Sequence, residues 1–268
     1  MSFGQPPRIT SVAHYIHLNG VNTWYDERGQ GGPLVLMHGG LTDSRDFGGN
    51  LDALASQFRV YLPERRGHGH TADVEGPLTL ELMAQDAVAF LEMIVRQPAH
   101  LVGYSAGAAV ALRTAIARPD LVDRLVLVSG WFSNDGLIAR PSADGEPPRQ
   151  LVAAYASVSP DGTDHFPVVI AKVAQAAAAE DTGLVVADLN ALVCQTLVMV
   201  GDDDLVSLEH TLLLYRSVPN AQLAVVPSAS HLLLFEKPAL CTRLVEEFLT
   251  TEPQPTLMPI RRAHARAA

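Results

Sequence analysis

The sequence predicts an α/β protein in which helices cover both faces of a mostly parallel central sheet. Short apolar runs that end in glycine or aspartate recur along the chain, and segments with the apolar spacing of helices separate them. Strands that are apolar throughout are typical of sheets covered on both faces, and their alternation with helices is typical of parallel order. Of the 268 residues, 48% are hydrophobic and 18% are charged, a composition that excludes a disordered chain.

About eight strands are expected. The first two form a hairpin over 16–25, because the turn pair Asn19-Gly20 lies between residues that favour strands. The other strands are expected within 33–40, 59–69, 100–107, 121–130, 195–204 and 221–227. Ligands of such sheets bind beyond the carboxyl ends of the strands, so polar residues at these ends are the first candidates for a functional site.

Four intervals between or after the strands have the periodicity of helices. In the first of them, apolar residues recur at three- and four-residue spacing and so lie on one helix face. The second interval is expected to be helical until Pro119. The expected helices lie within 79–96, 106–120, 207–218 and 237–250.

One long segment, 131–193, breaks the alternation of strands and helices. It begins with Trp131 and Phe132, continues through a stretch rich in proline and glycine, and has helical pieces near 150–157 and 168–180. The segment is too long for a simple connection, and it follows a strand on the side where ligands bind. We therefore expect a short helical lid after the sixth strand. The expected divisions are a core of residues 1–130 and 194–250, a lid of residues 131–193, and a partly disordered tail of residues 251–268.

Charge and cysteine content narrow the class of protein. The formal net charge is −10, and a surface this acidic repels phosphate backbones, so nucleic acid is not an expected partner. The two cysteines, Cys194 and Cys241, are too few for a disulfide framework and lack the clustering of a zinc site. We find no signal peptide and no run of about 18 apolar residues that could span a membrane. The expectation is a cytoplasmic monomer or homodimer that acts on a small molecule and does not bind a membrane.

GYSAG at 103–107 has the form G-x-S-x-G, follows an apolar strand and opens a helix. This is the setting of a nucleophile elbow. A tight turn there strains the backbone at Ser105 and exposes its hydroxyl near the positive end of the helix. Gly103 and Gly107 leave room for the close approach of strand and helix. We therefore expect Ser105 to be the nucleophile and the neighbouring Tyr104 to contact the substrate.

A serine hydroxyl is a poor nucleophile without a base. His231 directly follows the last expected strand, so it lies at the same edge of the sheet as Ser105. The base in turn needs a carboxylate that fixes its tautomer. Three candidates, Asp202, Asp203 and Asp204, lie where the preceding strand ends. The chain order of serine, aspartate and histidine is that of serine hydrolases with a nucleophile elbow.

Acyl transfer also needs hydrogen-bond donors for the oxyanion. HGG at 38–40 ends an expected strand, and glycines there let backbone N–H groups point inward. The expected donors are the N–H groups of Gly40 and Ala106. We expect His38 to hold this turn rather than to transfer a proton.

Five motifs together resemble the α/β-hydrolase fold superfamily over about residues 15–250. They are HGG at 38–40, RGHG at 66–69, GYSAG at 103–107, GDDD at 201–204 and SHLLLFEKP at 230–238. The resemblance implies the α/β-hydrolase fold and a serine hydrolase of the small esterase, enol-lactonase or perhydrolase-like type. No cofactor is expected, and no metal is expected because no cluster of ligands has the spacing of a metal site. It also implies that the acid is the last residue of G-x-x-D, which is Asp204. The chain departs from the usual motifs at Glu64, Thr71 and Ala108.

The residues and the resemblance favour hydrolysis of a small to medium ester or lactone through an acyl-enzyme. A C–C bond hydrolase and a cofactor-free perhydrolase are alternatives on the same triad. A receptor-like protein that binds a small ligand with slow or no turnover is an alternative of another class. The apolar residues of the lid, with Trp131 or Phe132 near the acyl group, predict a substrate with an apolar body. A cation in the pocket would indicate an anionic acyl group, and the nearest candidates by motif are Arg45, Arg140, Arg149 and Lys172.

Overall fold

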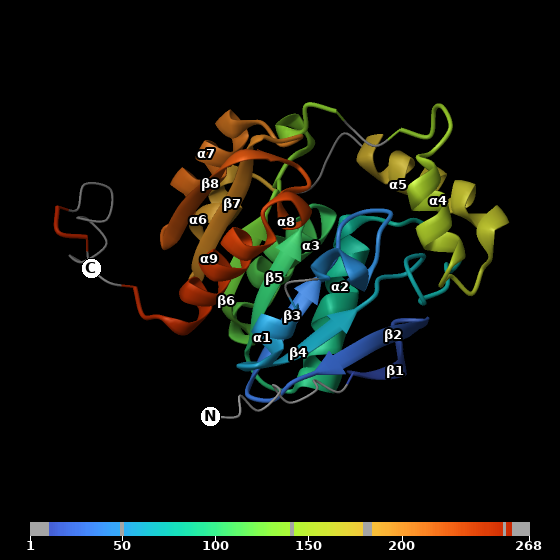
Figure 1. The fold of residues 1–268 in the computed structure, drawn as a ribbon, viewed down its shortest axis with the longest axis horizontal. Helices are drawn as coiled ribbons and strands as arrows, with labels where there is room; N and C mark the ends of the chain where they lie inside the picture. The colour runs from blue at the N-terminus through green and yellow to red at the C-terminus, as the bar shows by residue number, and fades with distance from the viewer. Residues whose placement is uncertain (1–10, 49–50, 140–141, 179–183, 254–255, 259–268) are drawn as a thin grey trace, which may run out of the picture.

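The computed structural model describes residues 11–48, 51–139, 142–178, 184–253 and 256–258. An eight-stranded sheet runs through the molecule in the order β1-β2-β4-β3-β5-β6-β7-β8 (Figure 1). The strands β1 and β2 are antiparallel to their neighbours, and β3 to β8 are parallel, which confirms the predicted fold class. The strands are β1 Ser11–Leu18, β2 Val21–Arg28, β3 Gly32–Met37, β4 Phe58–Pro63, β5 Ala99–Tyr104, β6 Val122–Val128, β7 Gln195–Asp203 and β8 Ala221–Ser230.

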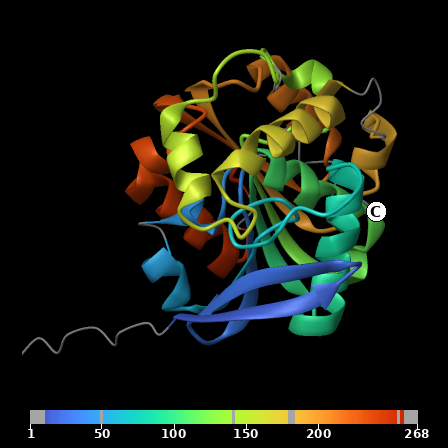
Figure 2. The same ribbon diagram turned by 90° about the vertical axis from the view of Figure 1, so that its right-hand side faces the viewer.

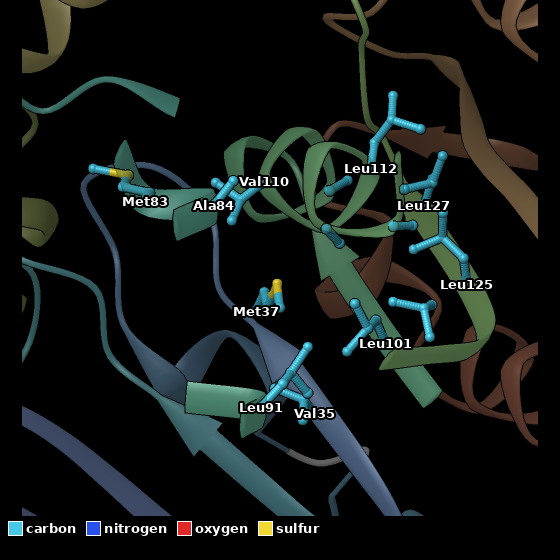
Figure 3. Close-up of a cluster of buried hydrophobic side chains, with 14 of the residues drawn as sticks. Val35, Met37, Met83, Ala84, Leu91, Leu101, Val110, Leu112, Leu125 and Leu127 are labelled. Atoms are coloured by element: carbon cyan, nitrogen blue, oxygen red, sulfur yellow. The ribbon is translucent and has the colours of Figure 1, made fainter. Parts of the chain in front are cut away.

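The central strands are buried because both of their faces are covered by helices. Alternate residues of a strand point to opposite faces, so Leu34 and Leu36 join one core cluster whereas Val35 and Met37 join the other. Figure 3 shows the cluster that contains Val35 and Met37. In it, side chains of the sheet lie beside Leu112 of the helix that follows Ser105. This double coverage explains why the strands read as continuous apolar runs.

Helices α2, α3 and α7 contribute to one core cluster, and α1, α8 and α9 contribute to the other. The side chains of Thr79 and Ser207 cap α2 and α7 by accepting a hydrogen bond from a backbone N–H in the first turn. The bounds are α1 Leu51–Ala55, α2 Leu80–Phe90, α3 Ala106–Ala117, α7 Leu208–Ser217, α8 Leu233–Glu236 and α9 Pro238–Thr250, with short 3₁₀ turns at Ser44–Phe47, Pro119–Leu121 and Asn134–Gly136.

The helix predicted over 79–96 changes geometry before its end. After α2 the chain continues as a π-helical turn, Leu91–Val95, which closes with a hydrogen bond from the Arg96 N–H to the Leu91 carbonyl at 2.7 Å. Arg96 then takes a left-handed conformation with φ of 61° and ends the helix. The apolar periodicity predicted the buried face correctly but not this change in winding.

The segment that was expected to interrupt the alternation contains α4 Arg149–Ala156, a 3₁₀ turn Thr163–His165, α5 Phe166–Ala178 and α6 Val186–Asn190. Helices α4 and α5 lie beyond the ends toward which the arrows of β3 and β5 point (Figure 1), and Figure 2 turns this side toward the viewer. The tail expected over 251–268 lies outside the described residues at 254–255 and from 259 onward. In the described part of the chain, no helix is long and apolar enough to cross a membrane.

Candidate active site

Ser105 occupies a strained turn between β5 and α3. Its φ of 55° and ψ of −121° lie in a region that side chains rarely adopt. A Cβ on Gly103 would meet the backbone of Gly107, and a Cβ on Gly107 would meet the carbonyl of Met37. The two glycines are therefore needed for the close approach of strand and helix, as the motif predicts. The Ser105 N–H donates to the Val128 carbonyl at 2.8 Å and ties the turn to the next strand.

His231 lies between Ser105 and Asp204. Its Nε2 is 2.9 Å from Ser105 Oγ, and its Nδ1 is 2.7 Å from Asp204 Oδ1. Because an ionised carboxylate only accepts hydrogen bonds, Nδ1 carries the proton and Nε2 is left as the acceptor for the serine hydroxyl. The structure thus brings together the three residues that sequence and resemblance selected.

Asp204 is 8% exposed and accepts hydrogen bonds from four donors. Besides His231, these are the Ser129 hydroxyl at 2.6 Å and the N–H groups of Val206 at 3.0 Å and Gly201 at 3.2 Å. Burial alone would raise the pKa of Asp204, but the hydrogen bonds from His231 and Ser129 lower it below its ordinary value. The carboxylate is therefore ionised at neutral pH. Ser129 was missed in the sequence, where it follows β6 without any motif.

The other two aspartates of this loop do not contact His231. Asp202 accepts a hydrogen bond from the Ala229 N–H at 3.0 Å, and Asp203 is exposed. The geometry therefore agrees with the resemblance, which selects Asp204.

Gly40 and Ala106 lie next to each other at the serine. A Cβ on Gly40 would be 3.5 Å from the Cβ of Ala106. Ala106 is the first residue of α3, where N–H groups have no partner within the helix. The two residues expected to supply the oxyanion donors therefore lie side by side next to Ser105.

Buried groups hold the turn that carries Gly40. The Gly39 N–H donates to Asp46 Oδ2 at 2.7 Å, and the Gly39 carbonyl accepts from Arg65 Nη2 at 2.6 Å and His38 Nδ1 at 2.9 Å. The His38 ring also accepts from the Arg65 N–H at 3.1 Å. Burial, and then the charge of Arg65, hold the pKa of His38 well below its ordinary value, so the neutral ring holds the turn.

A cavity of about 330 Å³ opens at Ser105 and His231. Its walls are mostly apolar and include Leu78, Met83, Leu137 and Val173. This size suits a small ligand with an apolar body.

Of the three residues expected to contact the substrate, one lines the cavity and two do not. Trp131 lines the cavity, but Tyr104 and Phe132 do not, which corrects the expectation for these two residues. Tyr104 is buried against the opposite core cluster, and its hydroxyl donates to the His231 carbonyl at 2.9 Å. Phe132 stacks on the His210 ring, with 4.3 Å between the centroids.

The cations that line the cavity are not the expected ones. Arg45 pairs with Asp43, Lys172 pairs with Asp73, and Arg149 is not among the lining residues. The fourth candidate, residue 140, lies outside the described residues. The arginines at the cavity are Arg65 and Arg113. The sequence contained a signal for Arg113, because it is the one charged residue in the mostly apolar stretch 106–117.

Comparison with known proteins gives a consistent result. Residues 34–244 match the Alpha/beta hydrolase family. The chain is 30% identical over 255 residues to the "Putative carbamate hydrolase RutD" of Caulobacter sp. (strain K31), covering 83% of this chain and 94% of that protein. It is 26% identical to the 2-hydroxymuconate semialdehyde hydrolase of Pseudomonas putida, covering 91% and 96%. The enol-lactonase from Burkholderia xenovorans LB400 is similar with a TM-score of 0.72 at 23% identity, over 89% of this chain and 100% of that one. This chain therefore belongs to the alpha/beta hydrolase family.

Proposed function

We propose that this protein hydrolyses a carboxylic ester or a lactone through an acyl-enzyme formed on Ser105. The observation that carries the proposal is the hydrogen-bonded chain from Ser105 Oγ to His231 Nε2, and from His231 Nδ1 to Asp204, at 2.9 Å and 2.7 Å. A serine, a base and an orienting carboxylate in this arrangement are the recurring parts of nucleophilic acyl transfer.

In the first step, His231 Nε2 takes the hydroxyl proton as Ser105 Oγ bonds to the substrate carbonyl carbon. The imidazolium that forms is stabilised by Asp204, which keeps its negative charge throughout. His231 then donates the proton to the leaving oxygen, and the acyl group remains on Ser105. Water enters, loses a proton to His231 and releases the acid, so the protein returns to its starting state.

The N–H groups of Gly40 and Ala106 stabilise the oxyanion, and each such donor is worth about 3–4 kcal/mol. The Gly40 N–H belongs to the same peptide unit as the Gly39 carbonyl, which accepts from the Arg65 guanidinium. A cationic donor at one end of a peptide unit polarises the donor at the other end. Arg65 is thus a positioning residue for the oxyanion donor.

The names of relatives and structural neighbours support an acyl substrate but differ in its type. They include a carbamate hydrolase, a semialdehyde hydrolase and an enol-lactonase. The test is a panel of p-nitrophenyl esters of graded chain length beside a lactone and a carbamate. We expect multiple turnovers on an ester or a lactone. A stoichiometric burst without further turnover would instead support the receptor-like alternative, and cleavage of none of these substrates would contradict the proposal.

We propose that the part of the expected lid, residues 131–193, that the structure describes at 142–178 covers the cavity. Three residues of α5, Val173, Ala176 and Ala177, line the cavity that contains Ser105. The segment is tied to the core by hydrogen bonds from Arg45 Nη2 to the Ala154 carbonyl at 2.7 Å and from Lys172 Nζ to Asp73 Oδ2 at 2.6 Å.

Replacing Lys172 with methionine is expected to loosen this lid. Asp73 also accepts from His165, and burial would raise its pKa, but the hydrogen bonds from Lys172 and His165 lower it. A carboxyl whose pKa is lowered by folding contributes stability above its unfolded pKa and loses it as the pH falls toward the folded one. Hydrogen bonds to charged groups are worth about 1.5–3 kcal/mol, so amide exchange in α5 should quicken about 10- to 100-fold at pH 7. The difference in the amide exchange rate of α5 between the wild type and Lys172→Met should shrink below pH 4. Lys237→Met, in front of α9, is the control, and equal exchange in both variants would contradict the lid contact.

Replacing Trp131 is expected to change substrate preference, whereas replacing Phe132 is expected to lower stability. Trp131→Ala enlarges the cavity and should change chain-length preference by the equivalent of about 1–3 kcal/mol. Phe132→Ala removes a core contact outside the cavity, so it should cost about 3–5 kcal/mol of unfolding free energy and leave the substrate ranking unchanged. Thermal unfolding and the ester series measure the two effects. The reverse pattern would show that the assignment of the two side chains is wrong.

A further inference from the structure

Ser129 directly follows β6, the strand that lies between those carrying Ser105 and Asp204. In the sheet, β6 pairs with β5 on one side and with β7 on the other. The last residue of β6, Val128, accepts a hydrogen bond on its carbonyl from the Ser105 N–H at 2.8 Å. The next residue, Ser129, donates its hydroxyl to Asp204 Oδ2 at 2.6 Å. Two adjacent residues thus connect the turn of the nucleophile to the acid.

The backbone of Ser129 is held in a conformation that side chains disfavour. Its φ is 50°, in the left-handed region where glycine is favoured. The residue is 1% exposed, and its N–H donates to the Met199 carbonyl of β7 at 2.8 Å. The loop also packs closely against α3, because a Cβ on Gly130 would lie 2.6 Å from the Cβ of Ala108. Such strain persists only where surrounding contacts fix it, so the position from which the hydroxyl reaches Asp204 is fixed as well.

The four donors to Asp204 divide between its two oxygens. Oδ1 accepts from His231 Nδ1 at 2.7 Å and from the Val206 N–H at 3.0 Å. Oδ2 accepts from Ser129 Oγ at 2.6 Å and from the Gly201 N–H at 3.2 Å. Rotation of the carboxylate away from His231 would therefore break hydrogen bonds on both oxygens. Among the donors that the structure describes, Ser129 is the one side chain besides His231, and its hydrogen bond is the shortest of the four.

Both ring nitrogens of His231 are engaged within the triad, so other charges act on the ring only through space. Tyr104 packs beside the ring, with 5.5 Å between the centroids, and it is neutral because burial raises its pKa. The charged groups that the structure describes on β7, on α8 and on the cavity wall are Asp202, Asp203, Glu236, Glu81, Arg65 and Arg113. All of them remain when Ser129 is replaced, so a change in the titration of His231 would report on Asp204.

We propose that Ser129 is a positioning residue of the triad, which holds the Asp204 carboxylate toward His231 and weakens the attraction of that carboxylate for the imidazolium. The inference rests on the proposed function, in which His231 is the base for Ser105. A donor on Oδ2 offsets part of the carboxylate charge, and an opposite charge beside a histidine favours its protonated form. With Ser129 present, His231 therefore loses its proton at a lower pH than it would beside Asp204 without that donor, which extends activity toward acidic pH.

The first measurement is an NMR titration of the His231 ring, which needs no turnover. The Cε1–H signal is followed in the wild type, Ser129→Ala and Ser129→Gly, and it is assigned by its loss in His231→Gln. Glycine suits the left-handed backbone, so it removes the hydroxyl together with the strain. We expect the titration midpoint to rise by about 0.5 to 1 pH unit in both variants, because a hydrogen bond to the carboxylate is lost. Ser129→Cys, whose thiol is a weak donor, should give an intermediate midpoint.

The second measurement is the pH dependence of kcat and kcat/KM for the same proteins on the preferred ester. The acid limb of kcat/KM should move upward by the same amount, and kcat at its plateau should fall about tenfold, because the carboxylate aligns His231 less well. KM should change little, since neither Ser129 nor Asp204 lines the cavity. Ser228→Ala and Ser228→Gly are the matched controls. Ser228 also has a positive φ, 53°, but it is exposed, so both substitutions should leave the midpoint and the rates unchanged.

The outcomes separate this inference from the proposed function. A midpoint that is unmoved or lower in Ser129→Ala and Ser129→Gly would overturn the inference even if kcat fell, and ester hydrolysis by the wild type would leave the hydrolase proposal standing. A rise in only one of the two variants would trace to the backbone rather than to the hydroxyl and would also overturn it. A rise in both variants, with no hydrolysis of any ester by the wild type, would support the role of Ser129 and overturn the hydrolase proposal.

Discussion

Replacing Ser105 with alanine is expected to lower kcat by about 10⁶-fold, which is the scale of nucleophile loss in serine hydrolases. Without Oγ there is no atom to form the acyl-enzyme, and His231 and the oxyanion donors leave only a small residual rate. The fold should survive, because alanine keeps the Cβ and, among the described residues, the hydroxyl bonds only to His231. Steady-state hydrolysis of the preferred ester and thermal unfolding measure the two effects.

Ser228 provides a matched control for this substitution. It also has a positive φ, 53°, but it is exposed and lies before the end of β8. Ser228→Ala should keep wild-type turnover. If Ser105→Ala also kept near wild-type kcat, Ser105 could not be the nucleophile.

Replacing Asp204 with asparagine is expected to lower kcat by about 10⁴-fold. The carboxylate accepts the proton of His231 Nδ1, and an amide N–H in its place would select the tautomer with the proton on Nε2. His231 could then no longer accept the proton of Ser105. KM should change little, because Asp204 does not line the cavity.

Asp202→Asn and Asp203→Asn are the controls on the same loop. Asparagine at 202 can still accept from the Ala229 N–H, and residue 203 is exposed, so both variants should keep most of the activity. A crippled Asp203→Asn with an active Asp204→Asn would contradict the assignment of the acid.

Local patterns made most of the fold and of the candidate active site predictable. The elbow around Ser105 depends on glycines two positions away on either side, so five residues of sequence contain its physical requirements. His231 and Asp204 could be placed together because the carboxyl ends of parallel strands meet at one edge of the sheet. The hairpin turn at Asn19-Gly20 was equally local, and both turn residues have positive φ.

The cavity walls could not be predicted because they depend on contacts between distant segments. Trp131 and Phe132 are adjacent in sequence, and only packing decides that one faces the cavity and the other stacks on His210. Arg65 lies beside the RGHG motif, and its sequence context predicts only a turn. In the folded protein its guanidinium donates a hydrogen bond to the Gly39 carbonyl. Ser129 follows β6 and donates to Asp204, which follows the neighbouring strand β7, and no spacing in the sequence indicates that contact.

The most direct test of the account is covalent capture of the nucleophile. The protein is treated with a fluorophosphonate, whose phosphorus centre resembles the tetrahedral intermediate, and the adduct is located by intact mass and peptide mapping. The account predicts one adduct per chain, on Ser105, with none in Ser105→Ala and slow formation in Asp204→Asn. An adduct on another residue, or ester hydrolysis that continues after Ser105 is fully modified, would contradict it.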